Sequence, residues 1–233
     1  MSSSNNSKNK KKRNKIFYNF CYDFVKVTGA LPMLLWFRPK VYRPTGAKTP
    51  KGAVLVSANH IDLLDPVKIL LTFPGRRLHS LATKDLYKNK LLTFFFNQMH
   101  CIQVDKANFS VSAFHEVVSR LKDDRMVLIF PEGQVNTEKQ DTLLAFKSGV
   151  VLMAHKGNAP ILPVYIAKRE SRWHRLRVFI GEPIFVGDMS GKMPTMQDLT
   201  AICDTLRERE LELRKYSESL PFYKKQKNES ENN

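Results

Sequence analysis

Residues 51–72 read KGAVLVSANHIDLLDPVKILLT. The apolar run at 53–58 predicts a buried strand, because a strand covered on both faces is hydrophobic without alternation. The segment 65–72 predicts a helix, since it opens with Asp65 and Pro66, two residue types favoured at the start of a helix. A strand, a short polar loop and a helix form the repeating unit of α/β proteins. This stretch therefore indicates an α/β fold.

The same alternation continues toward the C-terminus. We expect further strands at 78–82, 126–130, 161–167 and 177–180, and helices at 84–97, 109–122, 142–155 and 198–215. The run MVLIF at 126–130 is continuously apolar, as a central strand should be. The pattern predicts one three-layer α/β domain at 38–217, with a central mixed sheet flanked by helices, followed by a polar C-terminal tail at 218–233.

His60 lies in the loop between the strand at 53–58 and the following helix, and Asp65 lies at the start of that helix. In open α/β sheets, ligands bind beyond the C-terminal ends of the strands. A short turn would bring the Asp65 carboxylate to one ring nitrogen of His60, which fixes the tautomer and makes the other nitrogen a better base. A structural interpretation makes Asp65 the N-cap of the helix, which is compatible with a catalytic role, and His60 an ordinary loop residue.

A second motif follows the apolar strand at 126–130. It reads Phe130-Pro131-Glu132-Gly133, and it places a carboxylate at the C-terminal end of a strand. The glycine lets the backbone approach a ligand closely. Alone, this tetrapeptide is explained equally well by a simple turn.

The motifs together resemble the glycerophospholipid acyltransferase family, of the 1-acylglycerol-3-phosphate acyltransferase type. That family carries N-H-x-x-x-x-D, a hydrophobic block ending in a basic residue, F-P-E-G, and a proline-bearing strand. The corresponding segments here, in the same order within residues 38–185, are Asn59-His60 to Asp65, Ile102–Lys106, Phe130–Gly133 and Pro160–Val164, with Phe146–Gly149 similar to the stretch before the last block.

The resemblance implies transfer of a fatty acyl group from acyl-CoA or acyl carrier protein to the free hydroxyl of 1-acyl-glycerol-3-phosphate, giving phosphatidic acid. His60 would be the general base and Asp65 would orient it. Neither a metal nor a bound cofactor is implied. The substrate-binding residues implied by the resemblance are Asn59, Lys106, Phe130, Pro131, Glu132, Gly133 and Lys147.

Three positions depart from the family pattern. Lys106 stands where an arginine is common, and Gln134-Val135 stand where the family often has Thr-Arg. Arginine contacts phosphate as a two-pronged donor, whereas lysine is a point charge. The acceptor headgroup therefore stays open, and another lysophospholipid or a glycolipid is the alternative acceptor.

The N-terminus is strongly basic. Residues 1–15 hold six of the 38 lysines and arginines and no acid, in a chain whose net charge is +16. Their polar composition predicts a disordered polybasic tail. Residues 16–37 are mostly apolar, but Lys15, Asn19, Asp23 and Lys26 fall on one helical face. We expect a membrane-associated helix lying in the interface, which Pro32 breaks or kinks. A membrane-spanning helix and a helix packed on the domain are the alternatives.

The expected partners follow from this charge. They are anionic membrane lipids, the lysophospholipid acceptor and the acyl carrier, at the cytoplasmic face of a membrane. The odd number of cysteines, three, also favours a reducing compartment. A non-catalytic basic module that binds membranes or nucleic acid is the alternative of a different class. No nucleic acid is expected, because much of the excess charge lies in the tail.

Overall fold

The computed structural model describes most of the chain, namely residues 2–105, 111–133, 135, 143, 146–169, 171, 173–187 and 194–222. Its centre is a seven-stranded sheet in the order β1-β7-β6-β2-β5-β3-β4. Only the β6–β7 pair within it is antiparallel, so the predicted mixed sheet is confirmed. The strands are β1 Lys40–Tyr42, β2 Val54–Ala58, β3 Leu78–Thr83, β4 Ile102–Val104, β5 Met126–Ile129, β6 Ile161–Ile166 and β7 Arg177–Ile180.

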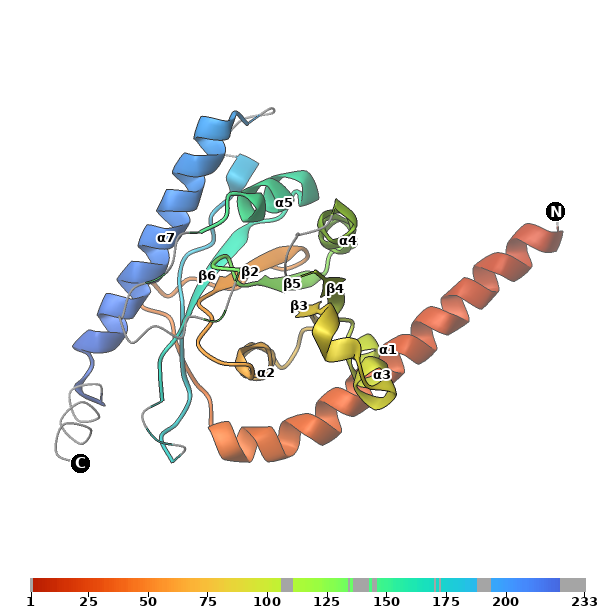
Figure 1. Ribbon diagram of the computed structural model, residues 1–233, viewed down its shortest axis with the longest axis horizontal. Helices are drawn as coiled ribbons and strands as arrows, with labels where there is room; N and C mark the ends of the chain where they lie inside the picture. Colours follow the sequence, from red (N-terminus) through yellow and green to blue (C-terminus); the bar gives the residue numbers. More distant parts are fainter. Residues whose placement is uncertain are drawn as a thin grey trace.

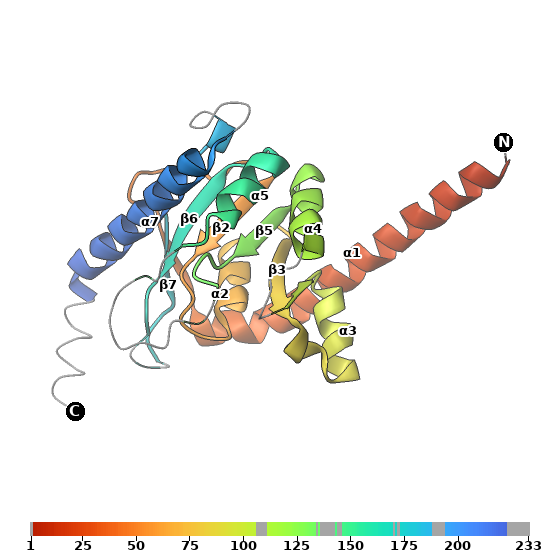
Figure 2. The same ribbon diagram turned by 45° about the horizontal axis from the view of Figure 1, so that its top comes forward.

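Helices cover both faces of this sheet (Figures 1 and 2). On one face lie α4, α5 and α7, and on the other lie α1, α2 and α3. The helices are α1 Ser2–Phe37, α2 Asp65–Thr72, the short 3-10 helix η1 Lys84–Tyr87, α3 Lys90–Gln98, α4 Val111–Lys122, α5 Gly149–Gly157 and α7 Met196–Ser219. The predicted three-layer α/β architecture is therefore confirmed.

The sequence of the central strand β2 is apolar at every position except Ser57 because the strand is covered on both faces. Leu55 belongs to the hydrophobic core beneath α4, α5 and α7. Val54, Val56 and Ala58 belong to the core beneath α1 and α2. Because successive side chains of a strand point to opposite faces, a strand with helices on both sides buries all of its side chains, so apolar residues dominate and the buried Ser57 needs a hydrogen-bond partner.

Helix α1 differs from the expectation at its start. It begins at Ser2, so residues 2–15, for which we predict disorder, continue the helix. Pro32 lies inside the helix, so it does not break it. The helix bends along its course (Figure 1). No glycine or proline precedes Gly29 in this helix, which explains how it extends without interruption through the basic segment.

Asp23 and Lys26 of the polar stripe of α1, together with Tyr22, face the domain. The Tyr22 hydroxyl accepts a hydrogen bond from Leu78 N (2.8 Å) and donates one to Leu78 O (3.2 Å). The Asp23 carboxylate pairs with Arg77 at 2.6 Å, and Lys26 Nζ donates to two carbonyls of the loop before β3. The exposed large apolar side chains of this helix include Phe20, Phe24, Val27, Leu31, Leu35 and Trp36.

Several predicted boundaries are corrected. The short edge strands β1 and β4 are too brief to carry a sequence signal, and the helix expected at 84–97 is divided into η1 and α3. The helix expected at 142–155 is observed only from Gly149, and the start of the 109–122 prediction lies outside the described residues. The domain, predicted to end at 217, continues to Leu220 and Phe222, which pack beside Phe179 and Leu213.

Helix α7 is joined to the central strand by a buried polar contact. Ser57 Oγ in β2 donates a 2.7 Å hydrogen bond to Oε1 of Glu210, whose side chain is fully buried. Burial raises the pKa of the Glu210 carboxyl well above its ordinary value, and the charge of Glu132 acts in the same direction against the opposing Ser57 hydrogen bond. Glu210 is therefore protonated in the folded protein at pH values where it would be ionised in the unfolded chain.

This contact predicts a pH-dependent effect of Glu210→Gln. The unfolded chain releases the proton near pH 4.5, so stability falls as the pH rises from there through the raised pKa of the folded state. Glutamine keeps the acceptor for Ser57 but cannot ionise. We expect the variant to gain stability over wild type as the pH rises, at about 1.4 kcal/mol for each unit of pKa shift.

Denaturant unfolding at several pH values between 4 and 8 checks this expectation, with the exposed neighbour Glu208→Gln as the matched control. A stability difference that is the same at every pH for Glu210→Gln would contradict a buried, neutral carboxyl.

Candidate active site

The two sequence motifs meet because their strands are parallel neighbours. Strand β2 pairs with β5 in the register Ser57 to Ile129, so the loop after β2 and the turn after β5 leave the same edge of the sheet. The Phe130 ring stacks on the His60 ring, with centroids 4.0 Å apart and planes 13° apart. Residues 70 positions apart in sequence thus form one site.

His60 and Asp65 are in direct contact. His60 Nδ1 lies 2.9 Å from Asp65 Oδ2, and the Asp65 side chain is fully buried while that of His60 is partly exposed. The same carboxylate oxygen accepts hydrogen bonds from the backbone N–H groups of Ile61 (2.6 Å) and Asp62 (2.8 Å). The N-cap of α2 is Leu64, so the alternative in which Asp65 caps the helix is wrong.

Lys68 completes this arrangement, and the sequence motifs did not identify it. Its buried Nζ lies 2.8 Å from Asp65 Oδ1 and 2.5 Å from Asp62 Oδ2. Burial alone raises the pKa of the Asp65 carboxyl, but the hydrogen bond to His60 and the charge of Lys68 bring it below its usual value. The i, i+3 spacing of Asp65 and Lys68 on α2 was the available signal.

The arrangement prepares His60 to accept a proton. An ionised Asp65 beside Nδ1 favours the tautomer that carries its proton on Nδ1. The lone pair is then on Nε2, on the far side of the ring from Asp65. A carboxylate, an imidazole and a hydroxyl substrate in this order are the parts of a general-base mechanism.

The turn after β5 supports the His60 loop. Glu132 is buried, and its Oε1 accepts a 3.3 Å hydrogen bond from the backbone N–H of His60. Gly133 has φ of +72°, and a Cβ atom there would lie 2.7 Å from Lys147 Nζ. The carbonyl of the buried Pro131 accepts from the backbone N–H of Lys147 at 3.1 Å. Lys147 therefore lies over the turn, at the site.

Asn59 has a different role from the one implied by the resemblance. Its side chain is buried, and its amide donates to Ile166 O (3.1 Å) and accepts from Ile166 N (2.7 Å). Both ends of the amide are thus engaged by the end of β6. Asn59 holds the His60 loop against the neighbouring strand, which replaces the predicted substrate contact with a positioning role.

Cations near the site are only partly described. Lys106 and Gln134 lie outside the described residues, whereas Val135 lies within them, half-buried. Lys84, which the motifs did not identify, directly follows β3 and lies 3.3 Å from Asp105. Within the described ranges, no group of three or more His, Cys, Asp or Glu side chains is arranged to hold a metal ion.

Three relatives with described activities resemble this chain along much of its length. A 1-acyl-sn-glycerol-3-phosphate acyltransferase of Bacillus subtilis is 27% identical over 201 residues, which are 84% of this chain and 96% of that enzyme. Enzymes with the same name from Streptococcus pneumoniae and Limnanthes douglasii are 24% and 23% identical. The alignments cover 79% and 61% of this chain, and 69% and 51% of those enzymes.

The fold also has a solved counterpart. The crystal structure of the 1-acyl-sn-glycerophosphate acyltransferase PlsC from Thermotoga maritima superimposes with a TM-score of 0.61 at 19% sequence identity, over 91% of this chain and 84% of that one. The model of the family described as Acyltransferase matches residues 38–167, which include both strand-end motifs. With more than half of its length matched by that model, the chain belongs to the acyltransferase family.

Proposed function

We propose that this protein transfers a fatty acyl group from an acyl thioester to the free hydroxyl of 1-acyl-sn-glycerol-3-phosphate, forming phosphatidic acid. The observation that carries the proposal is the contact between His60 Nδ1 and the buried Asp65 carboxylate at the sheet edge. The names of the related enzymes support the same acceptor. The donor is acyl-CoA or acyl carrier protein.

In the proposed reaction His60 acts as base and then as acid. Nε2 takes the proton from the acceptor hydroxyl while its oxygen attacks the thioester carbonyl. The tetrahedral intermediate collapses by breaking the carbon–sulfur bond, and the leaving sulfur receives the proton from the imidazolium. An ester and a thiol result. Asp65 stays ionised throughout and stabilises the transient positive charge on His60.

The acceptor phosphate is assigned to cations at this edge of the sheet. Lys106 follows β4 and is the residue expected from the family pattern, while Lys147 lies over Gly133. Charged hydrogen bonds to phosphate are stronger than neutral ones, so a small number of lysines suffices to select a phosphorylated acceptor. Glu132 and Gly133 keep the turn in place beside the ring of His60.

Membrane association through α1 completes the proposal. Asn19–Phe37 is long and apolar enough to cross a bilayer, with a mean hydropathy of 1.2, and only 12% of that segment is buried. Its polar stripe is bonded to the domain, and its apolar side chains are exposed. A helix with one face held by the protein and an exposed apolar face suits an interfacial position better than a span. We place the enzyme on the cytoplasmic face, where the soluble acyl carriers are found.

His60→Ala is expected to lower turnover by about a thousandfold or more, because general-base catalysis contributes roughly 10²–10⁴-fold. The fold should persist, since the His60 side chain is not part of the hydrophobic core. Asp65→Asn should lose much of the activity, because the charge that selects the tautomer is removed. Thiol release from acyl-CoA with lysophosphatidate measures both variants.

Asp62→Asn is the matched control, since it removes one partner of Lys68 but leaves the His60–Asp65 contact intact. We expect a smaller loss than for Asp65→Asn. Near-normal turnover by folded His60→Ala protein would contradict the assignment of His60 as the general base.

Lys106→Ala should raise the KM for a phosphorylated acceptor more than about tenfold, since a charged hydrogen bond contributes roughly 1.5–3 kcal/mol. Lys106→Arg should retain more activity, because arginine keeps the charge. The dependence of rate on lysophosphatidate concentration in wild type and both variants checks this. Equal KM values for all three proteins would mean that Lys106 does not contact the headgroup, and a panel of other lysolipids would then identify the acceptor.

Removal of residues 2–15 deletes six positive charges and should weaken binding to anionic vesicles, with a smaller dependence on salt. Each lysine or arginine near such a surface contributes about 1 kcal/mol. Vesicle sedimentation between 50 and about 500 mM salt measures the change, with zwitterionic vesicles as the control. Unchanged binding at low salt would assign membrane attachment to the apolar face of α1 alone.

A further inference from the structure

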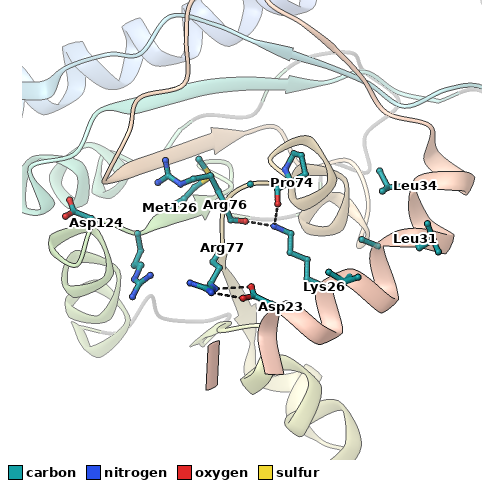
Figure 3. A pocket seen from close by; sticks show the side chains of 13 residues that line it. Asp23, Lys26, Leu31, Leu34, Pro74, Arg76, Arg77, Asp124 and Met126 are labelled. Carbon is teal, nitrogen blue, oxygen red and sulfur yellow. Dashed lines mark hydrogen bonds and ion pairs between the residues drawn. The ribbon is translucent and has the colours of Figure 1, made fainter. Parts of the chain in front are cut away.

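A cavity lies away from His60, at the opposite edge of the sheet. Its volume is about 690 Å³, and α1 forms one wall of it (Figure 3). The other walls are Gly75–Arg77, just before β3, and Asp124–Met126, at the start of β5. These are the N-terminal ends of strands whose C-terminal ends face the candidate active site, so the length of the sheet separates the two.

The lining of this cavity is apolar on one side and basic on the other. Helix α1 contributes Val27, Ala30, Leu31 and Leu34. Four basic side chains face two acidic ones across the rest of the wall: Lys26, Arg76, Arg77 and Arg125 against Asp23 and Asp124. The positive charge is therefore in excess, beside a surface suited to a hydrocarbon chain.

Much of this positive charge is not neutralised by carboxylates. Asp23 is engaged by Arg77, through bonds of 2.6 and 3.0 Å. Lys26 instead reaches across to the carbonyls of Pro74 (2.7 Å) and Arg76 (2.6 Å), as Figure 3 shows. Burial lowers the pKa of the Arg76 guanidinium, and the charge of Asp124 opposes this shift only in part. Partly buried cations of this kind gain stability from a bound anion.

The Arg76 guanidinium is held in place by backbone carbonyls, and the charge of Asp124 offsets its own charge only in part. Its two terminal nitrogens donate to the backbone carbonyls of Pro50 and Gly52. These carbonyl dipoles orient the guanidinium but do not cancel its positive charge. Together with Arg125, it gives the cavity a fixed basic side that an anionic ligand complements.

The cavity is open toward the exposed apolar face of α1, which indicates that its ligand comes from a lipid surface. Val27 and Leu31 line the cavity and are nevertheless 70% and 64% exposed, so the apolar wall continues onto the outer face of α1. That face also carries the exposed Phe20 and Phe24. A molecule that is anionic at one end and apolar at the other would reach the cavity directly from a lipid surface. The volume also lies within the usual range of ligand pockets, roughly 300–1,000 Å³.

We propose that this cavity binds the phosphate headgroup of an anionic membrane phospholipid between α1 and the N-terminal edge of the sheet, at a site separate from the one that carries the reaction. One acyl chain lies along Val27, Leu31 and Leu34, and the phosphate lies against Arg76 and Arg125. The proposal rests on the membrane association of α1 proposed above. In this proposal a bound lipid fills part of the space between α1 and the domain.

The test uses the full chain and dioctanoyl phosphatidylglycerol below its micelle concentration, with binding measured by isothermal titration. We expect saturable binding, at least tenfold weaker for dioctanoyl phosphatidylcholine, which has no net negative charge, and for glycerol 3-phosphate, which has no acyl chains. Arg125→Gln should weaken binding by about tenfold, as expected for one charged hydrogen bond. Leu31→Asp, an exposed position that should not disturb folding, should weaken it by a similar factor.

Two controls separate this site from the active site. Lys156→Gln removes an exposed cation on α5, outside the cavity lining, and should bind as wild type does. His60→Ala should also bind as wild type does, even though it loses turnover. A wild-type protein without acyl transfer but with Arg125-dependent lipid binding would overturn the proposed reaction and leave the cavity assignment standing.

Three results would overturn the assignment. The first is equal affinity for the zwitterionic lipid, which would remove the role of charge. The second is equal affinity for glycerol 3-phosphate or for a nucleotide, which would make the ligand a soluble phosphate. The third is wild-type affinity in both Arg125→Gln and Leu31→Asp, which would mean that the lipid binds outside this cavity.

Discussion

The candidate active site depends on one buried carboxylate. Asp65 is inaccessible to water, and a buried charge is tolerated only when partners compensate for its lost hydration. It has four such partners: the His60 ring, two backbone N–H groups and the Lys68 ammonium. The loop from 60 to 65 therefore has one conformation that satisfies the carboxylate. The position of the imidazole follows from that conformation, and so does its stacking on Phe130.

The fold was largely predictable because local pattern and tertiary environment agree. Helix α2 was predicted with its observed bounds, since Asp65-Pro66 is a typical helix start, and β7 was predicted with its observed bounds as a short apolar run followed by a glycine. The convergence of the His60 loop with the turn at Phe130 was also predictable, because parallel neighbours place their C-terminal ends together. The three-residue strands β1 and β4 were missed, since so short a run has no measurable periodicity.

Other features depend on contacts between distant residues that a single sequence does not contain. Ser57 and Glu210 are 153 positions apart, and neither indicates the other. The direction of the stripe on α1 is another example: its spacing left open whether the helix lies at a membrane or packs on the domain, and in the structure Asp23 and Lys26 bind the loop before β3. Amphipathic spacing identifies two faces of a helix, but only the partners decide which one faces the protein.

Gly133 and Lys147 restrict the mutational paths open to this protein. A side chain at 133 meets two separate obstacles, namely the positive φ of +72° and the Lys147 ammonium, which would lie 2.7 Å from a Cβ atom. Shortening Lys147 relieves the steric conflict but leaves the backbone cost of about 1–2 kcal/mol. A substitution of Lys147 therefore does not by itself make a substitution of Gly133 tolerable. The positive φ at position 133 still favours glycine in descendants that have lost Lys147.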